Sequence, residues 1–477
     1  MDYDAVVRAM LPEHQERLTQ MWKLLASAPS VDLNTDGPHS VLPDDDAAGL
    51  LAADIVEPVS RAHGVVLGSA FTVVEEKNAG LRRRFILWPK SLNQWIESQG
   101  YRSKVDLDMH PFPYVLSDYG GITDLTTSFF QVALPPHLRA LFAFKTKTGR
   151  FLQMKVLPMG LSISPEIMHK ITSTIAGHPR YSITPSRKVQ VNVWIDNIQF
   201  CGTQKAVDHA IRRVQRFAEQ CHVTLNEEET MVSQEYTFAG ITFNHREKTV
   251  AIGPKTARKI QADDTSKMTM ADLERIMGRL WFAARILDYP VHTCWWFLKS
   301  VRRLFSKWSR GLVTKDTPVR LGAAAQRELE AWAAAAKSNT PRRINPAPTN
   351  SREFDVYTDA TLTGWGAVCI DRLTKQTAVV GSKWSIPSQN INAAETRAVA
   401  CALAALRPTL NKDATIHLRV DNTSAISALK RGFARSHAIN EELSPVFAQY
   451  PYRVDVEYIK SAGFSADLIY STSTRYG

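Results

Sequence analysis

The chain is poor in cysteine and has no long apolar run. Its 477 residues include five scattered cysteines, which form neither a Cys-x-x-Cys pair nor a Cys/His cluster. This pattern excludes a disulfide framework, gives no sign of a zinc site and is typical of a reducing compartment. No stretch of about 20 apolar residues and no signal-peptide core is present. We therefore expect an intracellular protein, cytoplasmic or nuclear, that is not secreted and has no membrane partner.

Positive charge, in contrast, is in excess. The chain has 58 Lys and Arg against 47 Asp and Glu, a net charge of +11 and a pI near 9.3. An excess of this size indicates a polyanionic partner, most often nucleic acid, although a generic basic surface is the alternative. The length exceeds what one hydrophobic core supports and predicts two to four domains.

Periodicity and composition divide the chain into five segments. We expect an N-terminal helix and linker (1–50), an α+β region (51–245), a basic helical segment (246–310), a connection and linker (311–350) and an α/β domain (351–477). Within the helical segment, Thr269 and Asp272 predict a capping box, and Pro290 ends the helix that it opens. Trp295 and Trp296 then begin an amphipathic basic stretch, where they either stack on bases or pack between helices.

Two acids occur at the ends of short apolar strands in the α+β region. Asp124 ends one strand, and Asp196-Asn197 lies within the apolar run 191–200, where it predicts a tight turn between two strands. Two neighbouring carboxylates can bridge two divalent cations for phosphoryl transfer. Each Asp alone is equally well an ordinary turn or cap residue.

Four further acids occur in the last predicted domain. Asp359 and Asp421 end predicted strands, Glu395 lies where a helix opens, and Asp467 follows a strand near the last residues. Acids at the ends of adjacent strands and on a facing helix can converge on one pair of metal ions that polarises a phosphodiester. One of these acids alone would mean little, but the set predicts a second metal-dependent site.

In their order and spacing, these segments resemble the reverse transcriptases of retroelements over nearly the whole chain after residue 50. The resemblance implies an α+β right-hand polymerase, with fingers, palm and helical thumb, followed by an α/β ribonuclease H-like domain. It implies RNA-directed DNA polymerase and ribonuclease H activities. It also implies an RNA template, a DNA primer, an RNA–DNA hybrid and dNTPs as partners, and two Mg²⁺ ions, or Mn²⁺, in each active site.

The family's metal ligands fall on acids already singled out. In the polymerase they are Asp124 and Asp196, and Asn197 occupies the last position of the family's Tyr-x-Asp-Asp turn. In the ribonuclease H domain they are Asp359, Glu395, Asp421 and Asp467.

The family's substrate contacts also map onto single positions. Lys77 and Arg84 would clamp the triphosphate, and Phe129 would exclude the ribose 2′-hydroxyl unless it is a core residue. The remaining contacts are Met159 and Gly160 of the Leu-Pro-x-Gly segment, and Phe238 and Gly240 of the primer grip.

Two positions depart from the family. Asn197 carries no charge, and Glu229 replaces a usual Lys. Three functions therefore stay open: a working two-activity enzyme, a polymerase-impaired ribonuclease H that binds hybrids, and a domesticated non-catalytic nucleic-acid-binding subunit. Finer motifs, at 381–385 and 277–280, resemble the DIRS-like, tyrosine-recombinase group of retrotransposons with its VIPER-type elements.

Overall fold

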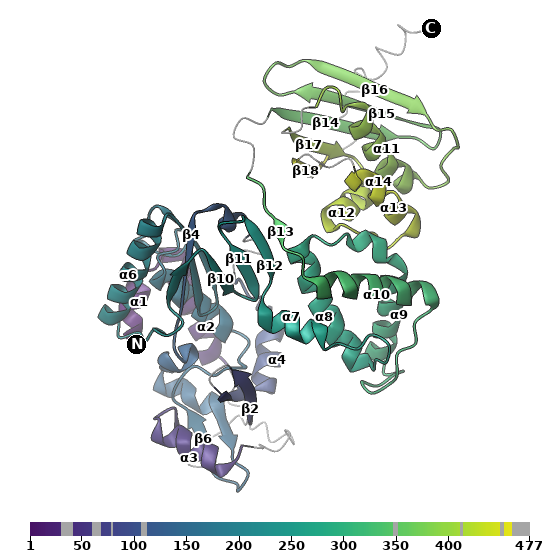
Figure 1. Ribbon diagram of the computed structural model, residues 1–477. Coiled ribbons are helices and arrows are strands. Elements are labelled where there is room, and N and C mark those ends of the chain that lie inside the picture. The colour runs from purple at the N-terminus through teal and green to yellow at the C-terminus, as the bar shows by residue number, and fades with distance from the viewer. Residues whose placement is uncertain are drawn as a thin grey trace. The chain divides into compact units, whose positions relative to one another are not determined.

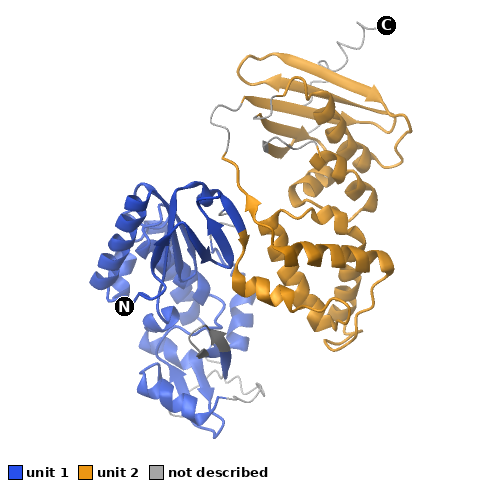
Figure 2. Ribbon diagram, in the orientation of Figure 1, with its two compact units in different colours: residues 1–250 blue, residues 251–477 orange. Residues whose placement is uncertain are grey.

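The chain forms two compact units, residues 1–250 and 251–477 (Figure 2). The computed structural model describes residues 1–29, 42–59, 68–77, 80–105, 112–346, 352–410, 414–448 and 453–459, without the side chains of 75–77, 80–82 and 453. Strand β12 (Thr249–Ile252) lies at the boundary, a few residues after the predicted one at 245. Among the described helices, none combines the length and the apolar character that crossing a membrane requires.

The first unit contains a four-stranded antiparallel sheet, whose strand β4 is labelled in Figure 1. Its order is β7-β8-β4-β9, with bounds β4 (Tyr119–Asp124), β7 (Val189–Trp194), β8 (Asn197–Gly202) and β9 (Met231–Ser233). Helices α5 (Ser164–Ile175) and α6 (Gln204–Gln220) pack against this sheet. Helix α6 buries residues at a helical period, namely Val207, Ala210, Ile211, Val214 and Ala218. Gly121 allows the close approach, because a Cβ there would lie 2.5 Å from Val207 Cγ1.

The N-terminal helices belong to the same core. The predicted N-terminal helix is two helices, α1 (Tyr3–Arg8) and α2 (Pro12–Ala26), because Pro12 lacks the backbone donor to continue the first. They bury Val6, Met10, Leu18, Met21 and Leu25. The fully buried Glu166 of α5 accepts hydrogen bonds from Arg17 Nε (2.8 Å) and the Tyr101 hydroxyl (2.6 Å). Residues 1–29 are thus built into the first unit and are not a separate segment.

The first unit also contains smaller elements. They are α3 (Asp44–Ala52), β1 (Val56–Pro58), β2 (Ser69–Lys77), β3 (Gly80–Trp88), α4 (Lys90–Ser98), η1 (Phe112–Leu116), η2 (Ser128–Gln131), η3 (Pro136–Phe142), β5 (Ala143–Lys145), β6 (Phe151–Met154), β10 (Glu235–Phe238) and β11 (Ile241–Asn244). Strands β2 and β3 form an antiparallel hairpin, and β1, β6 and β5 form a small sheet. Strands β10 and β11 are joined by Ala239 and Gly240, both with positive φ, as in a type I′ turn.

The second unit begins with helices. They are α7 (Pro254–Gln261), α8 (Met270–Leu287), η4 (Val291–Cys294), α9 (Trp295–Ser309) and α10 (Ala323–Ser338), followed by the short β13 (Arg342–Arg343). The predicted capping box is confirmed, since Thr269 N–H donates to Asp272 Oδ2 (3.0 Å) and Asp272 N–H donates to Thr269 Oγ1 (3.3 Å). Trp295 is buried, whereas Trp296 is 44% exposed, so only Trp295 is a core residue.

A five-stranded mixed sheet forms the rest of the second unit. Its order is β16-β15-β14-β17-β18, and β14, β17 and β18 run parallel. The strands are β14 (Glu353–Ala360), β15 (Gly364–Asp371), β16 (Thr377–Lys383), β17 (Thr415–Val420) and β18 (Arg453–Tyr458), and the helices are α11 (Ile391–Ala405), α12 (Thr423–Arg431), α13 (His437–Glu441) and α14 (Leu443–Ala448). Helix α11 packs on β14 and β15. Strands β14 and β17 therefore end side by side, close to the N-terminal turn of α11.

Candidate active sites

The hairpin of β7 and β8, hereafter the palm hairpin, brings Asp196 next to the end of β4, where Asp124 lies. Asp124 is the last residue of β4 and lies opposite Asn197, the first residue of β8. Directly after β4, Leu125 N–H donates to the Asp196 carbonyl (3.2 Å). The two-residue loop between β7 and β8 is Ile195-Asp196, so the expected Asp-Asn turn is wrong by one residue. Asn197 pairs with both neighbouring strands, and Ile195 takes the left-handed conformation (φ 56°), which is strained for a β-branched residue.

Two neutral donors hold the Asp196 carboxylate. Ser128 Oγ donates to its Oδ2 (2.9 Å), and Asn197 Nδ2 donates to its Oδ1 (2.8 Å). Two hydrogen bonds, one to each oxygen, fix the direction of this carboxylate. Asn197 thus supplies a hydrogen-bond donor to Asp196, whereas an aspartate at this position would add a repelling charge. Sequence reasoning missed Ser128, because a serine in a short turn carries no signal of its own.

The Leu-Pro-x-Gly segment (residues 157–160) packs against strand β3 and is hydrogen-bonded to helix α4. Gly160 has φ +100°, and a Cβ there would lie 2.5 Å from the Leu87 carbonyl oxygen. Asn93 Nδ2 donates to the Gly160 carbonyl (2.8 Å), and Asn93 Oδ1 accepts from Ser162 N–H (2.8 Å). Gly160 is exposed and Met159 half-buried, so both remain accessible beside this anchored loop.

The other predicted substrate contacts are scattered over the first unit. Phe129 lies in η2 and is half-buried against the core. Phe238 is only 4% exposed, whereas the turn residue Gly240 is half-buried next to the exposed Ala239. Arg84 is half-buried in β3, opposite Val73. Lys77 is the last residue of β2, and its side chain lies outside the described part of the chain.

A buried chain of hydrogen bonds joins the palm hairpin to β10. His245 is neutral here, because burial lowers the pKa of its imidazole, and its Nδ1–H donates to the Ser117 carbonyl (2.8 Å). Its Nε2 then accepts from the Tyr236 hydroxyl (3.1 Å), whose oxygen accepts from Gln199 Nε2 (2.8 Å). Asn192 Nδ2 completes the chain by donating to Gln199 Oε1 (3.2 Å). Sequence reasoning missed this chain, because its members are far apart in sequence.

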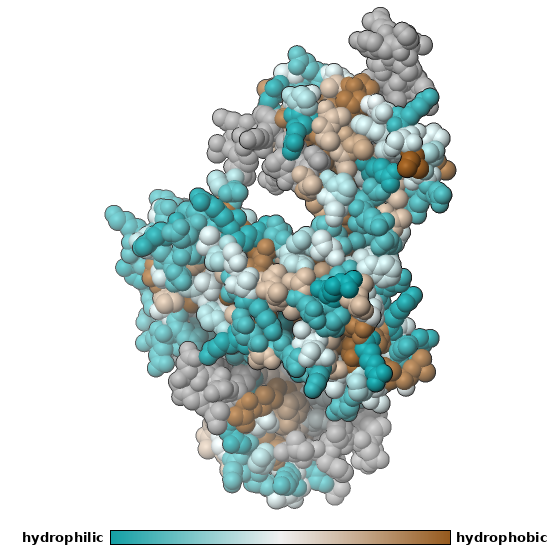
Figure 3. Space-filling view, turned by 45° about the vertical axis from the view of Figure 1, so that its right-hand side comes forward, coloured by the Kyte–Doolittle hydropathy of each residue, from teal (hydrophilic) through white to brown (hydrophobic). Residues whose placement is uncertain are grey.

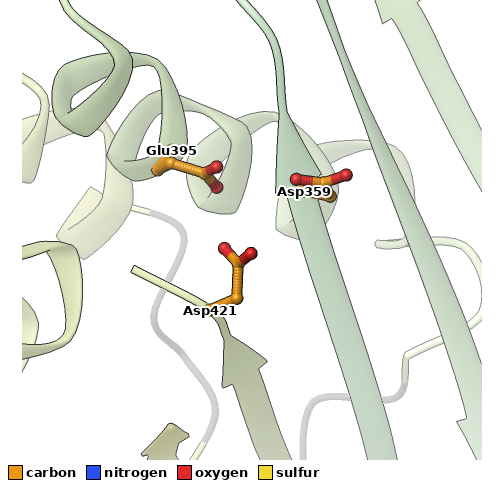
Figure 4. A group of neighbouring side chains, drawn as sticks. All are labelled: Asp359, Glu395 and Asp421. Atoms are coloured by element: carbon orange, nitrogen blue, oxygen red, sulfur yellow. The ribbon is translucent and has the colours of Figure 1, made fainter. Parts of the chain in front are cut away.

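Asp359, Glu395 and Asp421 form a second carboxylate cluster (Figure 4). One carboxylate oxygen of each lies within 4.8 Å of those of the other two. Asp359 comes from β14, Asp421 directly follows β17, and Glu395 lies in the first turns of α11. The parallel pairing of β14 with β17 puts the two aspartates at one edge of the sheet. Asp467, the fourth predicted ligand, lies outside the described residues.

The electrostatics of this cluster fit a bound cation. Glu395 is 4% exposed, and burial, together with Asp359 and Asp421, raises the pKa of its carboxyl to about 8. Burial and the Asp421 charge also raise the pKa of Asp359. Within the described residues, Glu395 Oε2 is buried without a hydrogen-bond partner. A divalent cation would both offset the repulsion and take up this oxygen.

Two asparagines position the helices that carry the cluster. Asn422 caps α12 by accepting from Ala425 N–H (2.9 Å), and its Nδ2 donates to Asn392 Oδ1 of α11 (2.8 Å). This bond ties the residue after Asp421 to the turn that bears Glu395. An asparagine before a helical pattern is a known N-cap signal, but the link to Asn392 required the structure.

The region around the palm hairpin is similar to known proteins. Residues 116–243 match the family described as "Reverse transcriptase (RNA-dependent DNA polymerase)". No curated protein matches the chain. A solved structure of the foamy viral protease-reverse transcriptase in complex with RNA/DNA hybrid is similar, with 13% identity, a TM-score of 0.51, and coverage of 96% of this chain and 62% of that chain. The same viral protein in complex with dsDNA gives 14% identity, a TM-score of 0.49 and 96% coverage of both chains. The expected α+β polymerase fold is confirmed, and residues 116–243 are similar to the reverse transcriptase family.

Proposed function

We propose that this chain is the RNA-directed DNA polymerase of a retrotransposon and also acts as a ribonuclease H, copying RNA into DNA and degrading the RNA of the hybrid. The observation that carries the proposal is the position of Asp196 beside the end of β4, where Asp124 pairs with Asn197 and Leu125 N–H donates to the Asp196 carbonyl. This point lies inside the segment that matches the reverse transcriptase family. Two carboxylates at this point are what nucleotidyl transfer by two metal ions needs.

In the palm, Asp124 and Asp196 would hold Mg²⁺ or Mn²⁺, which when bound supplies charge stabilisation for the primer 3′-hydroxyl and the leaving pyrophosphate. Ser128 and Asn197 fix the direction of the Asp196 carboxylate, because both donate to it. Phe129 stands next to Ser128 in η2, and we assign it the exclusion of a ribose 2′-hydroxyl. Met159 and Gly160 would lie along the template and the incoming dNTP.

In the ribonuclease H-like domain, Asp359, Glu395 and Asp421 would hold the cations, with Asp467 as a fourth ligand. Glu395 must release its proton to act as a ligand, since burial and two neighbouring acids raise its pKa to about 8. The substrate of this site would be the RNA strand of the hybrid that the polymerase produces.

The proposed partners are an RNA template, a DNA primer and the RNA–DNA hybrid. The net charge of +11 supports them, as does the foamy viral enzyme, which was solved with RNA/DNA hybrid and with dsDNA. We place the enzyme inside the cell, on the grounds that all five cysteines are free. The DIRS-like assignment rests on the motifs at 381–385 and 277–280 alone; a tyrosine-recombinase gene next to this one would support it.

One observation favours a second candidate, a hybrid-binding ribonuclease H with an impaired polymerase. Three carboxylates converge in the ribonuclease H-like domain, whereas the palm hairpin has two acids beside the uncharged Asn197.

Reciprocal variants separate the candidates: one preparation is assayed for Mg²⁺-dependent primer extension and for cleavage of a labelled hybrid. We expect Asp196→Asn to abolish extension alone and Asp421→Asn to abolish cleavage alone. Cleavage without extension in the unaltered protein would select the second candidate, and the absence of both would select a non-catalytic binding subunit.

A further inference from the structure

A cavity in the first unit is lined by helix α2 and by the segment that follows helix α4. It encloses about 310 Å³, which is near the lower end of the range for small-molecule sites. The α2 residues that line it lie three or four positions apart and so share one face of the helix. The residues of this cavity, hereafter the α2 cavity, include Arg17, Met21, Leu24, Tyr101, Arg102 and Lys104. Its wall is therefore partly apolar and partly cationic.

The buried Glu166 fixes the wall of the α2 cavity. Its carboxylate accepts twice from Arg17, from Nε (2.8 Å) and from Nη2 (3.1 Å), and once from the Tyr101 hydroxyl (2.6 Å). It also accepts from the backbone N–H of Lys104 (2.9 Å). Arg17 Nη2 donates in addition to the Arg102 carbonyl (3.0 Å), so both segments are held in place. A ligand would meet a preformed site and lose little free energy in ordering it.

The cations of the α2 cavity outnumber the acids around them. Glu166 is matched by Arg17 and by the buried Lys170, whose ammonium lies 3.8 Å from Glu166 Oε1. In the described part of the chain, no carboxylate forms an ion pair with the side chain of Arg102 or Lys104, and no acid is among the lining residues. Hydrophilic side chains predominate on the face of the molecule drawn in Figure 3, so an exposed cation is ordinary by itself. A hollow lined by one sign of charge is not ordinary, because it concentrates counter-ions.

We propose that the α2 cavity binds a compact polyphosphate, supplied either as inorganic pyrophosphate or as the phosphate tail of a nucleotide. Three cations in one hollow favour a ligand with more than one negative charge, and guanidinium groups match the geometry of phosphate oxygens. Met21 and Leu24 supply an apolar wall against which the nucleoside of a nucleotide would pack. The inference goes beyond the proposed function and does not rest on it, because none of the described acids of the two candidate active sites lines this cavity.

The test removes two cations of the cavity together: Arg102→Gln and Lys104→Gln. Both side chains are exposed and neither bonds to Glu166, so the double variant keeps the contacts that fix the cavity wall. Binding of sodium tripolyphosphate is measured by isothermal titration calorimetry in metal-stripped buffer, without EDTA, which is itself a polyanion. We expect one site per chain with a Kd below about 1 mM, and binding about 10-fold weaker in the double variant.

Two further ligands identify the source of the polyphosphate. Pyrophosphate and ATP are titrated under the same conditions as tripolyphosphate. Tighter binding of ATP than of tripolyphosphate would assign a nucleotide, because only ATP has a nucleoside to pack against the apolar wall. Equal or weaker binding of ATP would assign the inorganic anion.

A matched control removes the same charge elsewhere in the first unit: Lys205→Gln with Arg212→Gln, both exposed residues of α6. This control should bind tripolyphosphate as the unaltered protein does, and so should Asp196→Asn, which alters the palm. Equal affinity of the cavity variant and the unaltered protein would overturn the proposal, as would loss of binding in Asp196→Asn or a Kd above about 10 mM. Displacement of tripolyphosphate by a lower concentration of a single-stranded oligonucleotide would also overturn it, in favour of a nucleic-acid strand.

Discussion

Replacing Glu395 by Gln is expected to change the pH dependence of stability in the ribonuclease H-like domain. In the native, metal-free domain the pKa of Glu395 is about 8, against an ordinary 4.5. The native state therefore binds this proton more tightly than the unfolded state, and the Glu395 contribution to stability falls as pH rises from 4.5 to 8. Gln is neutral throughout and removes that dependence. Relative to the unaltered protein, the variant should gain about 2 kcal/mol between pH 6 and pH 8.

Hydrogen exchange measures this gain within the intact chain. The relevant amides are those of β14 and β17, which are paired at the centre of the five-stranded sheet. Exchange of the variant and of the unaltered protein is compared at each pH in EDTA, so that the intrinsic pH dependence of exchange cancels. Glu330→Gln, an exposed glutamate of α10 in the same unit, is the control and should give no such trend. If the stability of Glu395→Gln and that of the unaltered protein changed with pH in the same way, the close approach of the three carboxylates would be refuted.

Three further changes test other parts of the structure. Asn197→Ala removes a hydrogen bond to the Asp196 carboxylate, worth about 1.5–3 kcal/mol, so primer extension should slow by about 10- to 100-fold while hybrid cleavage is unchanged. Tyr236→Phe leaves two buried partners unsatisfied and should destabilise the first unit by about 1–3 kcal/mol in urea unfolding; a neutral result would contradict the hydrogen-bond chain. Gly160→Ala places a Cβ against the Leu87 carbonyl and should raise the KM for dNTP, with unaltered KM as the contrary result.

The sequence predicted the elements that local patterns control. The acids at strand ends, the capping box at Thr269 and the helical segment after it follow from periodicity and turn chemistry, which act over a few residues. The register of the palm hairpin was missed by one residue, because pairing of Asn197 with both β4 and β7 outweighed the preference of Asp-Asn for a turn.

Groups that depend on long-range contacts could not be predicted. Ser128 reaches Asp196 across 68 positions of the chain, and Tyr236 reaches Gln199 across 37. No local pattern encodes such pairs, since the sequence around a serine or tyrosine does not show which distant residue its hydroxyl contacts. The amphipathic pattern of the N-terminal helices likewise predicts a buried face but not its partner, so it does not place them in the core of the first unit.

The central claim is most directly tested by primer extension on an RNA template with the purified chain, dNTPs and Mg²⁺. The position of Asp196 beside the end of β4, which Asp124 occupies, and the hydrogen bonds that Ser128 and Asn197 donate to Asp196 predict incorporation of dNTPs that EDTA stops and Asp196→Asn abolishes. The absence of incorporation by a preparation that still cleaves the RNA of a hybrid would contradict the assignment of the palm as a working polymerase.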